Sequence, residues 1–236
     1  MSPAHPPKEF ALIAVVVPAH NEQAHLGACM ASLKAASQHW RLNQEPVMLV
    51  VVLDACNDAS ELVARAAGAT CVQVDARNVG VARAVGAQLA LDAGARWLSF
   101  TDADSVVAPD WLVAQLALGC DAVCGTVAVN DWGAYGDHMQ RHYAATYCDA
   151  DGHSHVHGAN LGISAQAYMR VGGFSPLCCH EDVALVEALR RDGARIAWSA
   201  APRVVTSARK AFRAPAGFGA TLARLDKQSQ HTDPQP

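Results

Sequence analysis

The chain has 236 residues, of which 51% are apolar and 17% are charged, and its formal net charge is -4. A chain of this length can bury a substantial core in one domain, and its composition excludes a disordered protein. The small acidic excess excludes a broad positive field that would recruit nucleic acid, so an anionic ligand has to be neutralised locally or by a metal.

The N-terminal region lacks the features of a membrane anchor or a secretory signal. The apolar run at residues 11–17 is followed by Pro-Ala-His-Asn-Glu, and no basic region precedes it. That run is too short to span a bilayer, and we expect no transmembrane segment. None of the eight cysteines forms a Cys-x-x-Cys pair, which indicates reduced thiols and a cytoplasmic protein.

The first half alternates apolar strands with helices. Strands are expected at 11–17, 47–53, 70–74 and 97–101, and helices at 22–36, from Asp58 onward, and at 79–93. This spacing predicts parallel strand–helix–strand units and an α/β fold, with a mostly parallel Rossmann-like sheet between helices. Ligands of such sheets bind at the carboxyl ends of the strands.

The second half is less regular. Helices are expected at 109–118, 134–147 and 181–192, strands at 122–129 and 161–164, and a polar loop at 153–160. We see no interdomain linker, so one domain is the economical interpretation.

The strongest chemical signal is Asp102-Ala103-Asp104, directly after the fourth expected strand. Two carboxylates separated by one residue can jointly hold a hard divalent cation such as Mg²⁺ or Mn²⁺. The alternative is a polar turn whose carboxylates cap the following helix.

Three further clusters end the other strands or open the helices that follow them. Pro18-Ala19-His20-Asn21-Glu22 offers backbone amides and a carboxylate to a nucleotide. Asp54 could accept a hydrogen bond from a base or ribose, while Asp58 is adequately explained as a helix cap. In the helix at 79–93, Arg83 could reach the base or the diphosphate.

The ordered set of motifs resembles the family 2 glycosyltransferases of the GT-A fold. The set comprises Pro-Ala-His-Asn-Glu, Asp54 to Asp58, Asn78-x-Gly80 to Arg83, Asp102-Ala103-Asp104, Gly158-Ala159-Asn160-Leu161, Gly172-Gly173-Phe174 and His180-Glu181-Asp182. The resemblance implies a nucleotide-sugar donor, a divalent metal on the Asp-x-Asp, and usually inversion at the anomeric carbon. It also implies a small-molecule, lipid-linked or glycan acceptor.

The resemblance also assigns roles to residues. It places the donor on Pro18, Ala19, Glu22, Asp54, Arg83, Asp102, Ala103 and Asp104, the metal on Asp102 and Asp104, and the acceptor near Gly158, Ala159 and Asn160. Asp182, within the Glu181-Asp182 pair, would be the catalytic base, since an inverting transfer needs a carboxylate to take the acceptor proton. The alternative is that the pair only complements a helix N-terminus.

Two features depart from the family pattern. The acidic pair common at the end of the second strand is Leu53-Asp54 here, so only the second acid remains. The Gln-x-x-Arg-Trp motif of processive members is absent, which speaks against a polymerising synthase.

With these roles, we expect a nucleotide-sugar-binding half at about 11–107, an acceptor-binding half at about 108–225, and a frayed tail at 226–236.

Two clusters in the second half have competing interpretations. His153, His155 and His157 would share a face of an extended segment, but no carboxylate or cysteine completes a familiar zinc spacing. Exposed loop histidines near the acceptor are the favoured interpretation. Arg209 and Arg213 belong to a basic segment that is either a solvated face or a mobile clamp on the donor diphosphate.

Two other classes of protein were weighed. A haloacid-dehalogenase-type phosphohydrolase also places Asp-x-Asp after a strand, but it needs a downstream lysine and an Asp-x-Asp on the first strand. A non-catalytic nucleotide-sugar binder would have no need of Glu181-Asp182.

Overall fold

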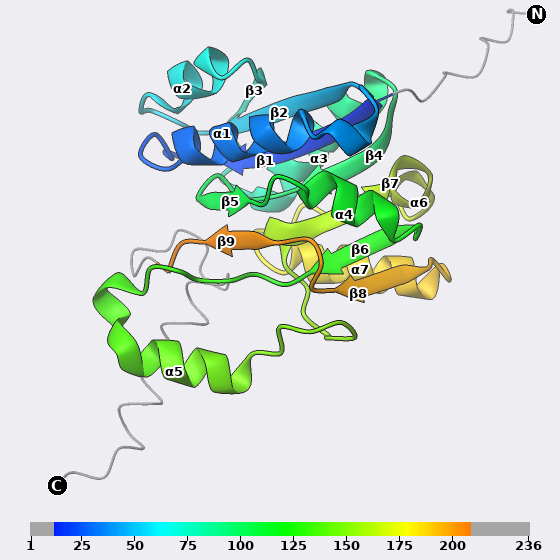
Figure 1. Cartoon of the computed structure of the whole chain (residues 1–236). Helices are drawn as coiled ribbons and strands as arrows, with labels where there is room; N and C mark the ends of the chain where they lie inside the picture. Colours follow the sequence, from blue (N-terminus) through cyan, green and yellow to red (C-terminus); the bar gives the residue numbers. More distant parts are fainter. Residues whose placement is uncertain (1–11, 209–236) are drawn as a thin grey trace, which may run out of the picture.

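The computed structural model describes residues 12–208, which form a seven-stranded mixed sheet with helices on both faces and a small second sheet (Figure 1). The strands are β1 (Leu12–Ala19), β2 (Val47–Asp54), β3 (Thr70–Val74), β4 (Ala95–Phe100), β5 (Ser105–Val107), β6 (Ala122–Gly125), β7 (Leu161–Ser164), β8 (Ile196–Ser199) and β9 (Val204–Thr206). The α-helices are α1 (Leu26–Ser37), α2 (Ser60–Ala66), α3 (Val79–Asp92), α4 (Trp111–Ala117), α5 (Gly136–Thr146), α6 (Ala165–Arg170) and α7 (Glu181–Arg191). Short 3-10 turns lie at Trp40–Leu42, Gly133–Tyr135 and Gly158–Asn160.

The main sheet has the strand order β3-β2-β1-β4-β7-β6-β8. The first four strands are mutually parallel, β7 is antiparallel to both of its neighbours, and β8 is parallel to β6. The order reverses beside β1, because the chain moves outward to β3 and then returns to β4 on the other side. In open α/β sheets a ligand binds at such a reversal, beyond the carboxyl ends of the strands.

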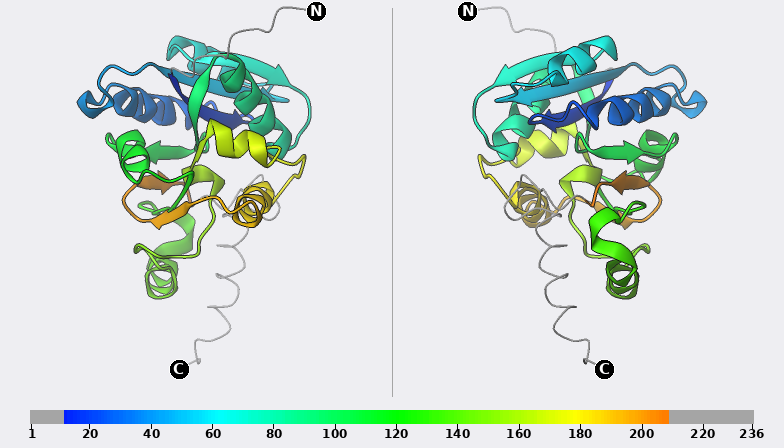
Figure 2. Two further views of the ribbon diagram at one scale, coloured as in Figure 1. Left: turned by 90° about the vertical axis from the view of Figure 1, so that its right-hand side faces the viewer. Right: turned by 90° about the vertical axis from the view of Figure 1, so that its left-hand side faces the viewer.

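Alternation along the buried strands divides the core into two layers. Ile13, Val15 and Val17 face one layer together with α1 and α4, whereas Ala14 and Val16 face the other with α3, α6 and α7. Figure 2 shows α1 and α3 on opposite sides of the sheet. All five side chains are essentially inaccessible, as expected for parallel strands covered on both faces.

A smaller unit stands beside this sandwich. β5 pairs with β9 in an antiparallel sheet, and α5 lies apart from the main layers, below β9 in Figure 1. A separate apolar cluster holds α5 through Trp132, Tyr135 and Met139.

The fold agrees with the α/β, GT-A expectation and corrects some details. The sequence did not indicate β5, α6 or β8, and the strand expected at 122–129 ends at Gly125. The expected single sheet is accompanied by the two-stranded β5–β9 sheet. The elements that were not indicated, β5, α6 and β8, are only three to six residues long, which is too short to show a hydrophobic periodicity.

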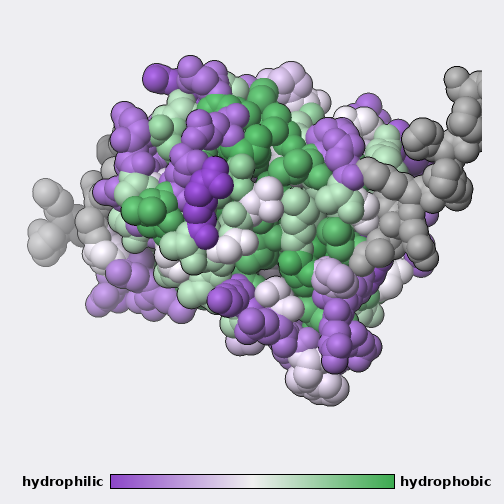
Figure 3. Space-filling view, turned by 90° about the horizontal axis from the view of Figure 1, so that it is seen from above, coloured by the Kyte–Doolittle hydropathy of each residue, from purple (hydrophilic) through white to green (hydrophobic). Residues whose placement is uncertain are grey.

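Within residues 12–208, no helix is both long and apolar enough to cross a bilayer. Seen from above, the surface shows apolar residues exposed between hydrophilic side chains (Figure 3).

Candidate functional site

The Asp-Ala-Asp motif lies at the reversal of strand order, directly beyond the carboxyl end of β4. The Asp102 side chain is 39% exposed, Asp104 is half-buried, and Ala103 between them packs into the core. The Cys29 thiol donates to the Asp102 carbonyl at 3.5 Å from α1. Burial, and then the charges of the two acids, raises the pKa of this thiol to about 12. The motif therefore combines a fixed backbone with carboxylates that remain partly open to solvent.

Arg83 of α3 links this motif to the start of α7. Its guanidinium donates to Asp102 Oδ1 at 2.5 Å through one terminal nitrogen and to Glu181 through the other. The arginine is 3% exposed, and its Cζ lies 5.9 Å from the centre of the Phe174 ring. Both terminal nitrogens of Arg83 hold protein carboxylates, and its contact with the donor stays a prediction.

The charges of the surrounding acids keep the buried Arg83 guanidinium protonated. Burial alone would lower the pKa of Arg83, but the charges of Asp102, Glu181 and Asp182 outweigh it and raise the pKa. Burial raises the pKa of Glu181, and Arg83 only partly offsets that effect. The positive charge of Arg83 thus offsets the repulsion among the neighbouring carboxylates.

The Glu181-Asp182 pair opens α7, where acidic side chains complement the helix dipole. The two acids have different surroundings. Glu181 is 3% exposed and faces Arg83, whereas Asp182 is half-buried and accepts the backbone N–H of Gly158 at 2.7 Å. Gly158 also packs directly on the Arg83 guanidinium, with no room for a Cβ. Only Asp182 retains a surface that a substrate could approach.

The Gly158-Ala159-Asn160 turn is buried and tied to distant parts of the chain. Asn160 is fully buried, and its amide nitrogen donates to the carbonyls of Thr126 at 2.7 Å and Pro202 at 2.8 Å. Its oxygen accepts from Trp111 Nε1 at 2.9 Å, and Ala159 is 7% exposed. The Asn160 side chain joins distant segments of the core, and the contact of this turn with an acceptor stays a prediction.

The loop after β1 is joined to the loop after β2 by reciprocal hydrogen bonds. The backbone amides of Asn21, Glu22 and Gln23 bond to the side chains of Cys56, Ser60 and Asp58 respectively. In return, the amides of Asn57 and Ala59 bond to the side-chain oxygens of Asn21 and Gln23. The two loops use each other's donors and α1 begins only at Leu26, and the use of these amides for a nucleotide stays a prediction. Pro18 and Ala19 end β1 beneath them.

Asp54 has a comparable structural role. Its carboxylate accepts the backbone N–H groups of Ala76, Arg77 and Asn78, each at 2.8 Å, and is 5% exposed. Asp54 thereby holds the loop from β3 to α3, and its contact with a base or ribose stays a prediction. Glu22 lies nearby with 6% of its surface exposed, and its predicted role with the nucleotide likewise stays a prediction.

The three alternating histidines form a stack in which His153 is buried and the other two are half-buried, whereas we expected exposed histidines. His153 is 4% exposed, and successive ring centres are 5.4 Å and 5.8 Å apart. His153 Nδ1 and His155 Nε2 accept backbone N–H groups, and His157 Nε2 lies 2.9 Å from the Tyr147 hydroxyl. Each ring therefore has one nitrogen committed to the protein.

Two tyrosines that the sequence analysis overlooked hold this region. Tyr143 donates to the Val127 carbonyl, and the Tyr147 hydroxyl accepts the Val127 N–H, both at 2.9 Å. Their rings stack at 4.5 Å, and Tyr147 stacks on His155 at 4.1 Å. The four-residue spacing of the two tyrosines could have indicated this stacking, because it places both rings on one face at the end of α5.

Arg209 and Arg213 lie outside the described residues. β9 ends at Thr206, which pairs with Ser105 directly after Asp104, so the described chain stops close to the Asp-Ala-Asp motif.

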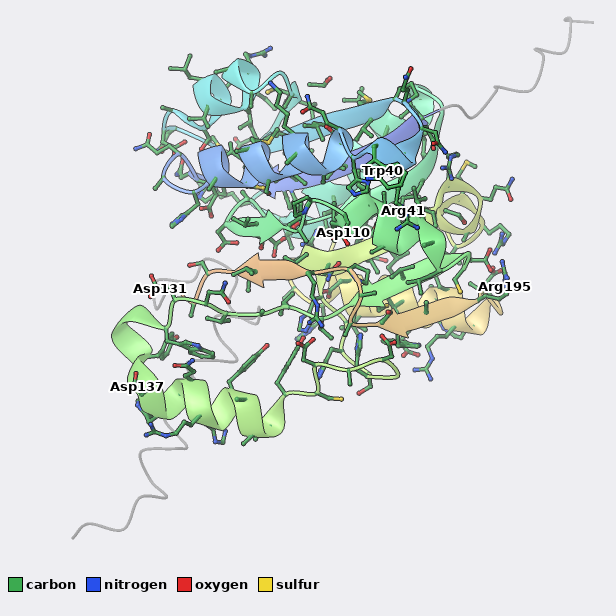
Figure 4. The ribbon with its side chains drawn as sticks, viewed as in Figure 1. Trp40, Arg41, Asp110, Asp131, Asp137 and Arg195 are labelled. Atoms are coloured by element: carbon green, nitrogen blue, oxygen red, sulfur yellow. The ribbon has the colours of Figure 1, made fainter. Side chains whose placement is uncertain are left out.

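No group of three or more potential metal-ligating side chains occurs within residues 12–208. A hollow lined in part by Arg41, Glu45 and Arg96 lies near the amino ends of β2 and β4, away from the acidic cluster. Figure 4 shows Trp40 and Arg41 on that side and Asp131 and Asp137 on the other, beside α5. The hollow is therefore separate from the candidate site.

Comparison with known proteins connects this geometry to a family. The model of glycosyl transferase family 2 matches residues 14–177. No protein with a curated function matches the sequence.

Solved structures of glycosyltransferases share the fold. One is S. aureus TarS 1-349 in complex with UDP-GlcNAc, with a TM-score of 0.67 and 14% identity over 95% of this chain and 68% of that chain. Another is the mannosyltransferase PcManGT from Pyrobaculum calidifontis in complex with GDP-Man and Mn²⁺, with a TM-score of 0.61 and 17% identity over 95% of this chain and 65% of that chain. A third, GalNAc-T7 with UDP, GalNAc and Mn²⁺, has a TM-score of 0.59 and 16% identity over 84% of this chain and 44% of that chain.

Proposed function

Because the chain belongs to glycosyltransferase family 2, we propose that it transfers a sugar from a nucleoside-diphosphate sugar to an acceptor hydroxyl with the help of a divalent metal. The observation that carries this proposal is the Arg83 bridge, which gathers Asp102 and the Glu181-Asp182 pair at the reversal of strand order. A site that only bound a nucleotide sugar would have no need of the second acidic pair.

The acidic motif fits a hard cation. Asp102 and Asp104 are partly exposed oxygen donors, and Mg²⁺ or Mn²⁺ commonly takes one or two carboxylates and completes its shell with phosphate oxygens and water. A bound cation would neutralise charge on the departing diphosphate. Two protein ligands are sufficient for such a site, and the structures of PcManGT and GalNAc-T7 contain Mn²⁺ with their nucleotides.

Asp182 is the better candidate for the catalytic base. In an inverting transfer the acceptor oxygen bonds to the anomeric carbon, the bond to the diphosphate breaks, and a carboxylate takes the hydroxyl proton. Glu181 is buried against Arg83, whereas Asp182 is accessible and oriented by the Gly158 N–H. Arg83 acts as a positioning residue that fixes both acidic groups.

The donor would occupy the half at about 11–107 and the acceptor the half at about 108–225. Glu22 and Asp54 lie on the donor side, and we propose that Arg209 and Arg213 contact the diphosphate, since β9 leads toward Asp104. All eight cysteines are free, which supports a cytoplasmic location.

Calorimetric titration with a panel of uridine and guanosine diphosphate sugars tests the proposal. We expect at least one donor to bind in the presence of Mn²⁺, and to bind much more weakly with excess chelator or in Asp104→Ala. The matched control is Asp110→Ala, which removes an exposed acid six residues away. Equal binding by wild type and Asp104→Ala, or binding unaffected by the chelator, would contradict the metal assignment.

A further inference from the structure

Two adjacent cysteines immediately precede the acidic pair of α7. Cys178 is exposed and Cys179 is half-buried. The two residues are neighbours in the chain, and neither takes part in the roles assigned above. Two neighbouring thiols at the surface, beside catalytic groups, form a potential site of covalent chemistry.

The segment that carries them is fixed on its upstream side. The Pro176 carbonyl accepts from Asn78 Nδ2 and the Leu177 carbonyl from the Gly80 N–H, both at 3.1 Å. Gly80 lies so close to Ser175 and Leu177 that a Cβ there would clash with their backbone atoms. The chain is thus tied to the start of α3 just before Cys178.

The downstream side is fixed as well. His180 has a positive φ of 59°, and Glu181 is buried against Arg83. Only Cys178, Cys179 and His180 separate the two anchored points. Because so few residues lie between these points, we expect a conformational change of the Cys178–Cys179 peptide to move Leu177 or Glu181.

We propose that Cys178 and Cys179 form a thiol–disulfide exchange site for small-molecule disulfides of the glutathione type, which closes reversibly to a disulfide between the two neighbours. The exposed Cys178 thiolate attacks one sulfur of the small disulfide, forms a mixed disulfide and releases one thiolate. The Cys179 thiolate then attacks the Cys178 sulfur and releases the second. The protein loses two hydrogens, and one small disulfide is reduced to two thiols.

The order of attack follows from the surroundings. Cys178 is the more exposed thiol, whereas burial, and then the neighbouring Cys178 and the charge of Glu181, raises the pKa of Cys179, which makes it the poorer first nucleophile. Once Cys178 carries the mixed disulfide, Cys179 is its immediate neighbour in the chain.

The closed form is strained and therefore easily reduced. Consecutive Cα atoms are about 3.8 Å apart across a trans peptide. Most disulfides join Cα atoms roughly 4.4–6.8 Å apart, and strained bonds have more oxidising potentials. We expect the dithiol form at rest and the disulfide only under oxidising conditions.

Closure would alter the peptide that leads into α7 and displace Glu181 and Asp182. The effect on transfer rests on the proposed function, whereas the covalent change does not. A displacement of catalytic groups by roughly 1 Å costs about a hundredfold in rate, and we expect a loss of that size on oxidation.

Glutathione buffers of increasing oxidised fraction provide the test. Trypsin releases residues 171–190, which contain both cysteines, while Cys148 lies in a different peptide. We expect the 171–190 peptide to lose two hydrogens without retaining glutathione, and transfer or donor hydrolysis to fall in parallel and recover with dithiothreitol.

Three variants make the result decisive. Cys178→Ser and Cys179→Ser should keep their activity under oxidation, whereas Cys148→Ser, which removes another exposed thiol, should respond as wild type does. A peptide that stays reduced, or that stops at the mixed disulfide, would overturn the proposal. Equal oxidative loss of activity in Cys178→Ser would overturn the link to α7. If no glycosyl transfer is found, the mass change still decides the chemistry.

Discussion

The loops on the two sides of the acidic cluster are held by different kinds of interaction. On the donor side, the loops after β1, β2 and β3 are joined by side chains that bond to backbone amides, with Asp54 and Asp58 contributing most. On the other side, residues 126–160 are held by a column of rings in which Tyr147 and His155 are central. The first arrangement fixes a backbone path independently of the loop's other side chains, while the second depends on the fit of a few aromatic groups.

The largest effect is expected at Asp182, which accepts the Gly158 N–H at the end of the second region. Asp182→Asn keeps the shape of the side chain but removes the base, so transfer should fall about a hundred- to ten-thousand-fold. Donor affinity should be nearly unchanged, because Asp182 contacts Gly158 and not the donor-side loops. Steady-state rates combined with calorimetry measure both quantities. Near-normal turnover would move the base to Glu181 or a histidine.

Removing Asp54 should give the next largest effect. Asp54→Ala leaves three backbone N–H groups without their carboxylate, and we expect the free energy of unfolding to fall by about 3 kcal/mol. Urea unfolding monitors the loss. Asp75→Ala is the control, since Asp75 is an exposed acid in the same loop. Equal stability of the two variants would show that Asp54 does not hold the loop.

Acid should weaken the ring column. Burial, and then the neighbouring His155, lowers the pKa of His157 to about 4; the charge of Asp182 opposes this, and His153 adds to it. The unfolded chain therefore binds more protons between pH 6.5 and 4, and the stability contributed by neutral His157 is lost as the pH falls through that range.

Urea unfolding at two pH values measures this contribution. Between pH 7 and 5 the wild type should lose about 2 kcal/mol more than His157→Gln. His138→Gln, which changes an exposed histidine of α5, should behave as wild type does. Identical pH profiles for wild type and His157→Gln would contradict the assignment.

The smallest effect is expected from one hydroxyl. Tyr147→Phe keeps the stacked ring but removes the acceptor for the Val127 N–H and the partner of His157. We expect a loss of about 1 kcal/mol in the free energy of unfolding. A loss as large as that of Asp54→Ala would mean that hydrogen bonds, and not ring packing, dominate on this side too.

The sequence predicts individual strands better than it predicts how the strands pair. The strands at 70–74 and 161–164 were predicted at their observed bounds, because apolar runs with clear flanks report local conformation. The antiparallel direction of β7 and the pairing of β5 with β9 could not be predicted, since pairing direction depends on partners distant in the chain.

The candidate site shows the same limit. Residue types identified the acids and Arg83, but not that Arg83 would be buried between two of them or that Asn160 would be enclosed. A polar residue after a strand looks the same in sequence whether it faces a ligand or another loop.

The reversed direction of β7 has a consequence for how this protein could change over time. β6 ends and β7 begins at neighbouring positions, with Cys124 paired to Leu161, so residues 126–160 leave and re-enter the sheet at almost the same point. Insertions, deletions or exchanges within this excursion leave the register of the surrounding strands unaltered. This excursion can therefore be remodelled without altering how the surrounding strands pair.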